Sequence, residues 1–79
     1  MEYNNVVAGK VIRKLRKERC LSQEVLSGLS GIGRSHLAMI EAGTKNANVE
    51  TLWRIADALD LRLSRLFELI EEEIEREQT

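Results

Sequence analysis

Residues 22–43 read SQEVLSGLSGIGRSHLAMIEAG, a stretch that predicts two short helices joined by a tight turn. Ser22 is a good N-cap for the first helix, because its hydroxyl can accept a hydrogen bond from an unpaired backbone N–H of the first turn. Leu21 and Leu26 are spaced for a hydrophobic staple across this start. Glu24 lies in the first turn, where the helix dipole favours negative charge. The first helix of the pair therefore begins directly after Ser22.

Small residues mark the end of that helix and the turn that follows it. We expect the chain to reverse near Gly31, because glycine reaches positive φ without steric cost. After the turn, Leu37 and Ile40 recur at helical spacing. Gly43 stands where helices commonly end in a left-handed residue. The second helix is expected over residues 34–42, and two helices this short need neighbours for stability.

The chain as a whole predicts one small all-α domain. Its 79 residues contain no proline and no strand-like alternation of apolar and polar residues. Apolar residues spaced three and four apart continue from Leu63 to Ile74, among many glutamates, and predict an acidic helical extension over about residues 64–77. Either its inner end closes the monomer core and its outer end is solvated, or its apolar stripe forms a dimer interface.

Charge is divided unevenly along the chain. Residues 1–67 hold eleven Lys and Arg against seven Asp and Glu, whereas residues 68–79 hold Arg76 against six glutamates. Affinity for a polyanion depends on local positive charge, so the net charge of −1 does not exclude a partner of that kind. We expect a cytoplasmic protein that does not bind membranes, since there is no long apolar run and an acidic helix is repelled by anionic lipid.

Several residues of the predicted pair carry a resemblance to a known family. Gln23, Ser27, Gly31, Leu37 and Ile40 fall at spacings shared by helix-turn-helix proteins of the phage repressor and Cro type, the XRE family. Residues 12–16 are similar to that family's first helix, and residues 40–43 to the end of its recognition helix. Residues 48–59 and 63–67 are similar to its fourth and fifth helices, so the resemblance covers about residues 6–68.

The resemblance implies a compact five-helix repressor-like domain. The helix-turn-helix would be its second and third helices, and its last helix would be extended. The chain departs from the family at Gly33, where Ser or Thr usually caps the recognition helix, at Ala38, where Ser or Thr is frequent, and near Ala47, where Pro is usual. A hydroxyl contact to phosphate at Gly33 is therefore lost.

The resemblance also implies which side chains meet DNA, with the second helix of the motif in the major groove. Arg34, Ser35, Ala38 and Met39 match the base-reading positions. Arg34 can pair bidentately with guanine, and Ala38 or Met39 can pack on a thymine methyl. The alternatives are a phosphate contact or a free surface charge for Arg34, and peripheral packing for Met39.

Phosphate contacts are expected from other polar side chains. Gln23 opens the first helix of the motif, where its amide and the exposed N–H groups suit a phosphate oxygen. Lys45, Asn46 and Asn48 follow the second helix, and His36 either packs or touches a phosphate. Gln23 could instead be an ordinary solvated residue, and Asn48 could instead be the N-cap of the next helix.

Other residues are expected to be structural. Arg16 and Glu41 match a pair that, in the family, bridges the first helix to the recognition helix. Trp53 lies in an apolar helical pattern with its neighbours and is expected in the core or an interface. The candidates for a dimer interface are Leu61, Leu63, Ile70 and Ile74.

An enzyme, a metal site and a cofactor are not expected. His36 is the only histidine and Cys20 the only cysteine, so neither a metal-ligand cluster nor an internal disulfide is indicated. The short run from Gly31 to Gly33 lacks the preceding strand and third glycine of a nucleotide-phosphate loop.

The expected function is therefore a homodimeric transcriptional regulator that binds inverted-repeat operators in double-stranded DNA. Small members of the family include restriction–modification controller proteins, and controllers are often of this size. The alternatives are an antitoxin and a protein-interaction adaptor on the same scaffold. Beside DNA and a second copy of the chain, the candidate protein partners are a toxin and RNA polymerase.

Overall fold

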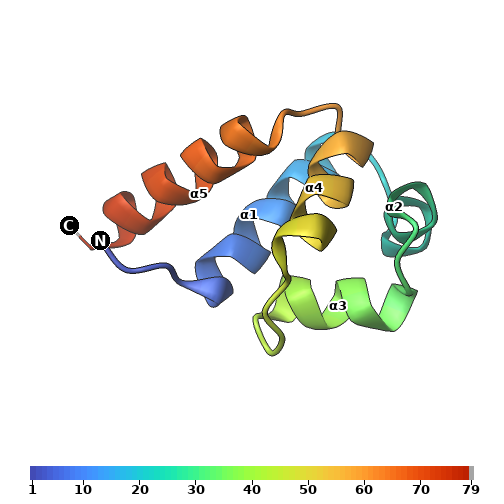
Figure 1. The fold of residues 1–79 in the computed structure, drawn as a ribbon, viewed down its shortest axis with the longest axis horizontal. Helices are drawn as coiled ribbons and strands as arrows, with labels where there is room; N and C mark the ends of the chain where they lie inside the picture. The colour runs from blue at the N-terminus through green and yellow to red at the C-terminus, as the bar shows by residue number, and fades with distance from the viewer. Residues whose placement is uncertain (79) are drawn as a thin grey trace.

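The computed structural model describes residues 1–78, which form helices without any strand (Figure 1). The elements in chain order are α1 (Asn5–Glu18), α2 (Gln23–Ser30), α3 (Arg34–Ala42), α4 (Val49–Ala58) and α5 (Leu63–Glu77). The prediction of an all-α, five-helix fold is confirmed. Helices α2 and α3 are the pair expected from residues 22–43.

Side-chain caps explain where three of the helices begin. Asn4, Ser22 and Asn48 each accept hydrogen bonds from backbone N–H groups in the first turns of α1, α2 and α4, at 2.8 to 3.2 Å. These bonds satisfy donors that a helix start otherwise leaves unpaired. Gly33 precedes α3 without a side-chain cap, as its sequence requires. The predicted cap roles of Ser22 and Asn48 are both confirmed.

Left-handed residues end the helices of the central pair. Gly31 closes α2 at φ 71° and Gly43 closes α3 at φ 79°, as the sequence predicts. The same conformation occurs without glycine at Cys20, with φ 57°, and at Asp60, with φ 59°, just after α1 and α4. These two positions carry a small strain that the sequence does not reveal.

All five helices contribute to a single hydrophobic core. Ile12, Leu26, Leu37, Ile55 and Leu66 are among its fully buried side chains. The remaining core residues come from the same helix faces and the α4 C-cap: Val7, Ala8, Val11, Leu15, Ile40, Leu52, Ala56, Leu59, Ile70 and Ile74. The short helices are thus held by burial against one another rather than by intrinsic helix stability.

The apolar stripe of α5 belongs to this core along most of its length. Ile70 is 1% exposed and Ile74 is 4% exposed, because α5 packs along α1. A side chain that is buried in the monomer has no surface left for a partner. Ile70 and Ile74 therefore cannot form the dimer interface, and the prediction that they do is wrong. The expectation that α5 closes the monomer core therefore holds as far as Ile74, and residues 75–78 beyond it are exposed.

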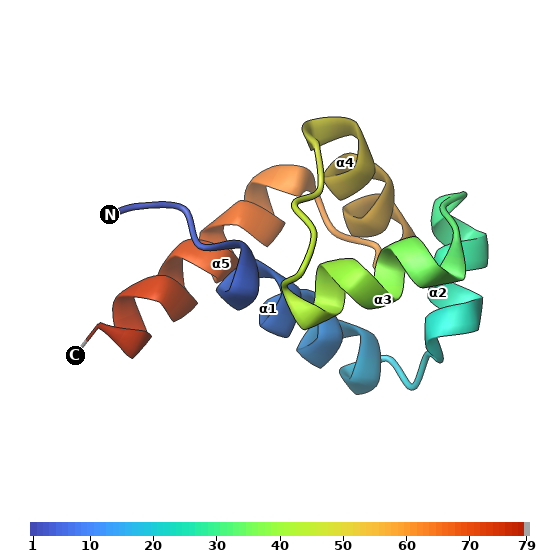
Figure 2. The same cartoon turned by 90° about the horizontal axis from the view of Figure 1, so that it is seen from below.

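Helices α3 and α5 lie on opposite sides of the molecule. In Figure 1, α5 runs along the upper side and α3 along the lower side, with α1 and α4 between them. Figure 2 shows the molecule from below, with α3 in front of the other helices. The acidic helix is therefore turned away from the face that α3 presents.

A glycine allows α1 to pass close to α3. A Cβ added at Gly9 would lie 2.2 Å from the carbonyl oxygen of Ile40 and 2.7 Å from that of Glu41. Only a residue without a side chain allows this backbone-to-backbone approach. A second tie sits at the same junction, where Asn5 Nδ2 donates to the carbonyl oxygen of Gly43 at 2.8 Å. Helix α3 is thus seated directly on α1.

We expect the substitution Gly9→Ala to destabilise the fold by about 1–3 kcal/mol, because the added methyl group meets backbone atoms that cannot rotate aside. The matched control is Gly28→Ala in α2, where a Cβ would have no neighbour within 4 Å. That change should stabilise by about 0.4–1 kcal/mol. Urea unfolding of both variants measures the difference, and equal effects would contradict the close approach.

Candidate nucleic-acid interface

The turn between α2 and α3 has the sharp geometry that the sequence predicts. Beyond Ser30 the chain turns at Gly31, and the backbone N–H of Ile32 donates to the carbonyl oxygen of Ser27 at 3.1 Å. Ile32 is half-buried against the core and anchors the turn. This turn leads α3 away from α2 at a fixed angle.

One face of α3 is buried and the other is open. Leu37 and Ile40 point into the core, at 0% and 3% exposure. Arg34 and Ser35 are exposed in the first turn of α3, and Met39 is 40% exposed one turn later. Figure 2 shows no helix in front of α3 on this side. The open face presents one cation, one hydroxyl and one flexible apolar side chain.

The residues nominated for base reading thus share an accessible surface, with Ala38 half-buried beside them. Within residues 1–78, the guanidinium of Arg34 has neither a hydrogen bond nor an ion pair with another side chain. An unpaired guanidinium keeps its full set of donors for a partner outside the protein.

The residues nominated for phosphate contacts lie in varied surroundings. Lys45 and Asn46 are exposed in the loop after α3, and His36 is half-buried. Asn48 is exposed, but its Oδ1 is occupied by the N–H of Thr51 at 2.8 Å. The Nδ2 group of Asn48 remains available as a donor.

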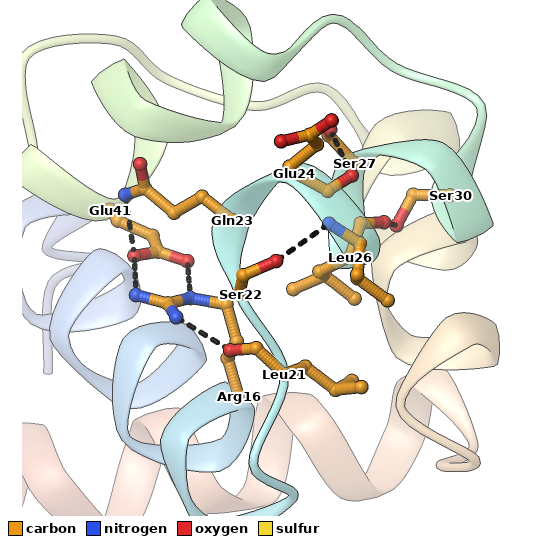
Figure 3. A network of polar contacts seen from close by, with 10 residues as sticks. Arg16, Leu21, Ser22, Gln23, Glu24, Leu26, Ser27, Ser30 and Glu41 are labelled. Atoms are coloured by element: carbon orange, nitrogen blue, oxygen red, sulfur yellow. Dashed lines mark hydrogen bonds and ion pairs between the residues drawn. The ribbon is translucent and has the colours of Figure 1, made fainter.

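A buried network fixes how α3 sits against α1 and α2 (Figure 3). Arg16 Nε donates to Glu41 Oε2 at 2.7 Å and Arg16 Nη2 donates to Glu41 Oε1 at 3.0 Å. The two side chains are only 9% and 2% exposed. Arg16 Nη1 also donates to the carbonyl oxygen of Leu21, at 2.7 Å. The predicted bridge from α1 to α3 is confirmed.

Within this network, the hydrogen bonds between Arg16 and Glu41 compensate for the burial of the two side chains. The hydrogen bonds that Glu41 accepts raise the pKa of Arg16 above its ordinary value, and they outweigh burial, which acts in the opposite direction. Every buried side-chain nitrogen and oxygen of the described residues has a hydrogen-bond partner. Arg16 therefore stays charged, and the network is fully hydrogen-bonded inside the protein.

Gln23 is a member of this network, which the sequence does not predict. Its Nε2 donates to Glu41 Oε1 at 3.0 Å, and the residue is half-buried (Figure 3). The interpretation of Gln23 as an ordinary solvated residue is therefore wrong. One of its two amide N–H groups points inward, and only the other is available to a phosphate. No spacing rule links Gln23 to Glu41, so sequence reasoning had no signal for this bond.

A second surface feature is an apolar groove between α4 and α5. It is lined by Trp53, Leu61, Leu63 and Phe67, with polar residues at its margin. Trp53 is 63% exposed, although its neighbours Ile55, Ala56 and Leu59 are buried. Trp53 is therefore not a core residue. Leu61 and Leu63 are half-buried and keep part of their surface free.

Helix α1 carries a basic surface of its own. Lys10, Arg13, Lys14 and Lys17 border a shallow surface on α1. Lys10 approaches Glu77 of α5, with 3.7 Å between Nζ and Oε1. At least part of this basic surface therefore faces the acidic helix.

Two other kinds of feature, a membrane-spanning helix and a metal centre, are absent from residues 1–78. None of their helices is long and apolar enough to cross a membrane. Within residues 1–78, no three His, Cys, Asp or Glu side chains come close enough together to hold a metal ion.

Two short helices at a fixed angle, with one open face and a bridge to the first helix, define a helix-turn-helix domain. The model of the helix-turn-helix family matches residues 12–66, which is more than half of the chain. The chain belongs to this family, in its XRE type, and is a DNA-binding transcriptional regulator.

Two curated relatives carry regulatory names. The uncharacterised HTH-type transcriptional regulator y4dJ of Sinorhizobium fredii is 36% identical over 53 residues, which are 67% of this chain and 69% of the relative. The immunity repressor protein of Bacillus phage phi105 is 37% identical over 61 residues, which are 77% of this chain. The match spans only 42% of that repressor.

Two solved structures are also similar. The restriction–modification controller protein C.AhdI of Aeromonas hydrophila has a TM-score of 0.79 and 36% identity, with 84% of this chain and 100% of that chain covered. The controller protein C.Esp1396I, solved as a tetramer in complex with its natural 35-base-pair operator, has a TM-score of 0.84 and 27% identity. That match covers 94% of this chain and 97% of the controller.

We expect Arg16→Met to destabilise the protein by about 3–5 kcal/mol, because it leaves the carboxylate of Glu41 buried without its cation. The double variant Arg16→Met, Glu41→Leu should recover most of this loss, since it removes both charges together. Urea unfolding measures the free energies. Lys10→Ala is the control, because it breaks an exposed ion pair whose expected effect is below about 1 kcal/mol. A loss as small for Arg16→Met as for Lys10→Ala would contradict the role of the network.

Proposed function

We propose that this protein regulates transcription as a homodimer that reads an inverted-repeat DNA sequence with α3. The observation that carries the proposal is the open face of α3, where Arg34 and Ser35 are exposed and the guanidinium of Arg34 is unpaired within the described residues. In helix-turn-helix complexes, the N-terminal part of this helix reads base edges in the major groove. Arg34 would pair with a guanine, and Ala38 or Met39 would contact a thymine methyl.

Phosphate contacts would hold the domain on the duplex. The candidates flank α3: Gln23 and the exposed N–H groups at the start of α2 on one side, and Lys45, Asn46 and the Nδ2 group of Asn48 on the other. His36 lies closer to the core and is the weaker candidate. Such contacts set orientation and affinity without reading sequence.

The groove between α4 and α5 is our proposed dimer surface. Leu61 and Leu63 keep the dimer role that the sequence suggests, and Trp53 and Phe67 extend the same apolar surface. A two-fold dimer would place its two α3 helices in successive major grooves, with half-sites about 34–36 Å apart. Because it acts on DNA, we propose a cytoplasmic protein.

The similarity to C.AhdI and C.Esp1396I supports a controller role in particular, since this fold covers 100% and 99% of those two chains. Selecting bound duplexes from a random DNA pool tests the function directly. We expect an enriched inverted repeat whose binding falls steeply with salt. Binding without enrichment, or none, would favour the antitoxin or adaptor role.

We expect Arg34→Ala to weaken binding to the selected duplex by about 1–3 kcal/mol and to relax base preference at one position per half-site. Competition binding against duplexes with single base changes measures both effects. Arg65→Ala is the matched control, because it removes the same charge from an exposed position on α5. Equal losses on every duplex for Arg34→Ala would count against base reading.

We expect Trp53→Glu to dissociate the dimer, because it places a carboxylate in an apolar groove already bordered by Asp57 and Asp60. Sedimentation velocity measures the oligomeric state. Leu29→Glu on α2 is the control, since Leu29 is 62% exposed against 63% for Trp53. A Trp53→Glu protein that remains a dimer would remove this groove from the interface.

A further inference from the structure

Gln23 belongs at once to the buried network and to the outer surface. It is the first residue of α2, and its half-buried side chain reaches Glu41 in the last turn of α3. The bond from its Nε2 to Glu41 Oε1 measures 3.0 Å (Figure 3). A primary amide nitrogen carries two N–H groups, and the second has no partner within residues 1–78.

The orientation of this amide is determined by charge. Its oxygen would be repelled by the carboxylate of Glu41, so the nitrogen must face inward. Glu41 itself cannot turn, because Arg16 binds both of its oxygens and is anchored in turn on the carbonyl oxygen of Leu21. The direction of the second N–H is therefore fixed before any DNA arrives.

We propose that Glu41 is a positioning residue for DNA binding, whose buried carboxylate holds Gln23 so that its second amide N–H is presented to a DNA phosphate. This inference rests on the proposed phosphate contact of Gln23. An amide that is already ordered loses less side-chain entropy on binding, which corresponds to roughly a two- to tenfold gain in affinity. Glu41 thus links the helix that reads bases to the helix that grips the backbone.

A double-mutant cycle tests the link between Glu41 and Gln23. The probe is a mixed-sequence duplex longer than two helical turns, at low salt, because a phosphate contact does not depend on sequence. Gln23→Ala is measured in the natural background and in the Arg16→Met, Glu41→Leu background, which lacks the anchor without an unpaired charge. We expect Gln23→Ala to weaken binding several-fold in the natural background and clearly less in the other.

The outcomes separate the two hypotheses. The same loss from Gln23→Ala in both backgrounds would overturn the positioning role and leave the phosphate contact intact. No loss in the natural background would overturn the phosphate contact itself, and the positioning role with it. Base reading by Arg34 is judged by its own experiment in either case.

Side-chain NMR of the unmodified protein tests the same inference without any variant. Gln78, an exposed residue at the end of α5, is the other glutamine of the chain and serves as internal control. We expect the Gln23 amide to have an order parameter near that of rigid backbone, about 0.85, and the Gln78 amide one below about 0.6. Equal mobility of the two amides in the free protein would overturn the proposal.

Discussion

The buried ion pair between Arg16 and Glu41 is the interaction on which the arrangement of the other parts depends. It joins the end of α1 to the end of α3, and through Leu21 and Gln23 it includes the start of α2. Helices of eight and nine residues are not stable alone. Their angle is set by directional bonds to a planar guanidinium and by close backbone contact at Gly9, whereas hydrophobic burial is non-directional. The ion pair thus contributes orientation more than net stability.

The buried and exposed faces of α3 and α5 are clearly separated. The inner face of α3 completes the core, and its outer face is open. The apolar stripe of α5 is buried by packing against α1. Exposed apolar surface lies instead between α4 and the start of α5, around Trp53 and Leu63. A small domain buries only a small hydrophobic core, and the last turns of α5 enlarge that core. The acidic residues of α5 then occupy the side that faces away from α3.

Local signals made most of the fold predictable. The caps at Ser22 and Asn48 and the left-handed glycines Gly31 and Gly43 follow from chemistry within a few residues, so the bounds of α2 and α3 could be read from the sequence. Features that depend on residues far apart in the sequence could not be predicted. An amphipathic stripe indicates which side of α5 is buried but not which element buries it. The sequence therefore predicts burial of Ile74 in the monomer core and burial in a dimer interface equally well.

The candidate site divides in the same way. The family resemblance places Arg34 and Ser35 on the DNA side of α3, and both are exposed in the structure. The inward bond of Gln23 depends on the position of Glu41 eighteen residues later, which only the folded chain determines.

The position of α5 has a consequence for how the protein meets a polyanion. Six of the chain's last twelve residues are glutamates, which concentrate negative charge on the outer turns of α5. A duplex repels these turns of α5 at separations up to the Debye length, about 8 Å at physiological salt. The protein is therefore turned by the field of the DNA before the two surfaces touch. Encounters with α5 toward the DNA are therefore shortened, and a larger share of the remaining encounters presents another side of the protein.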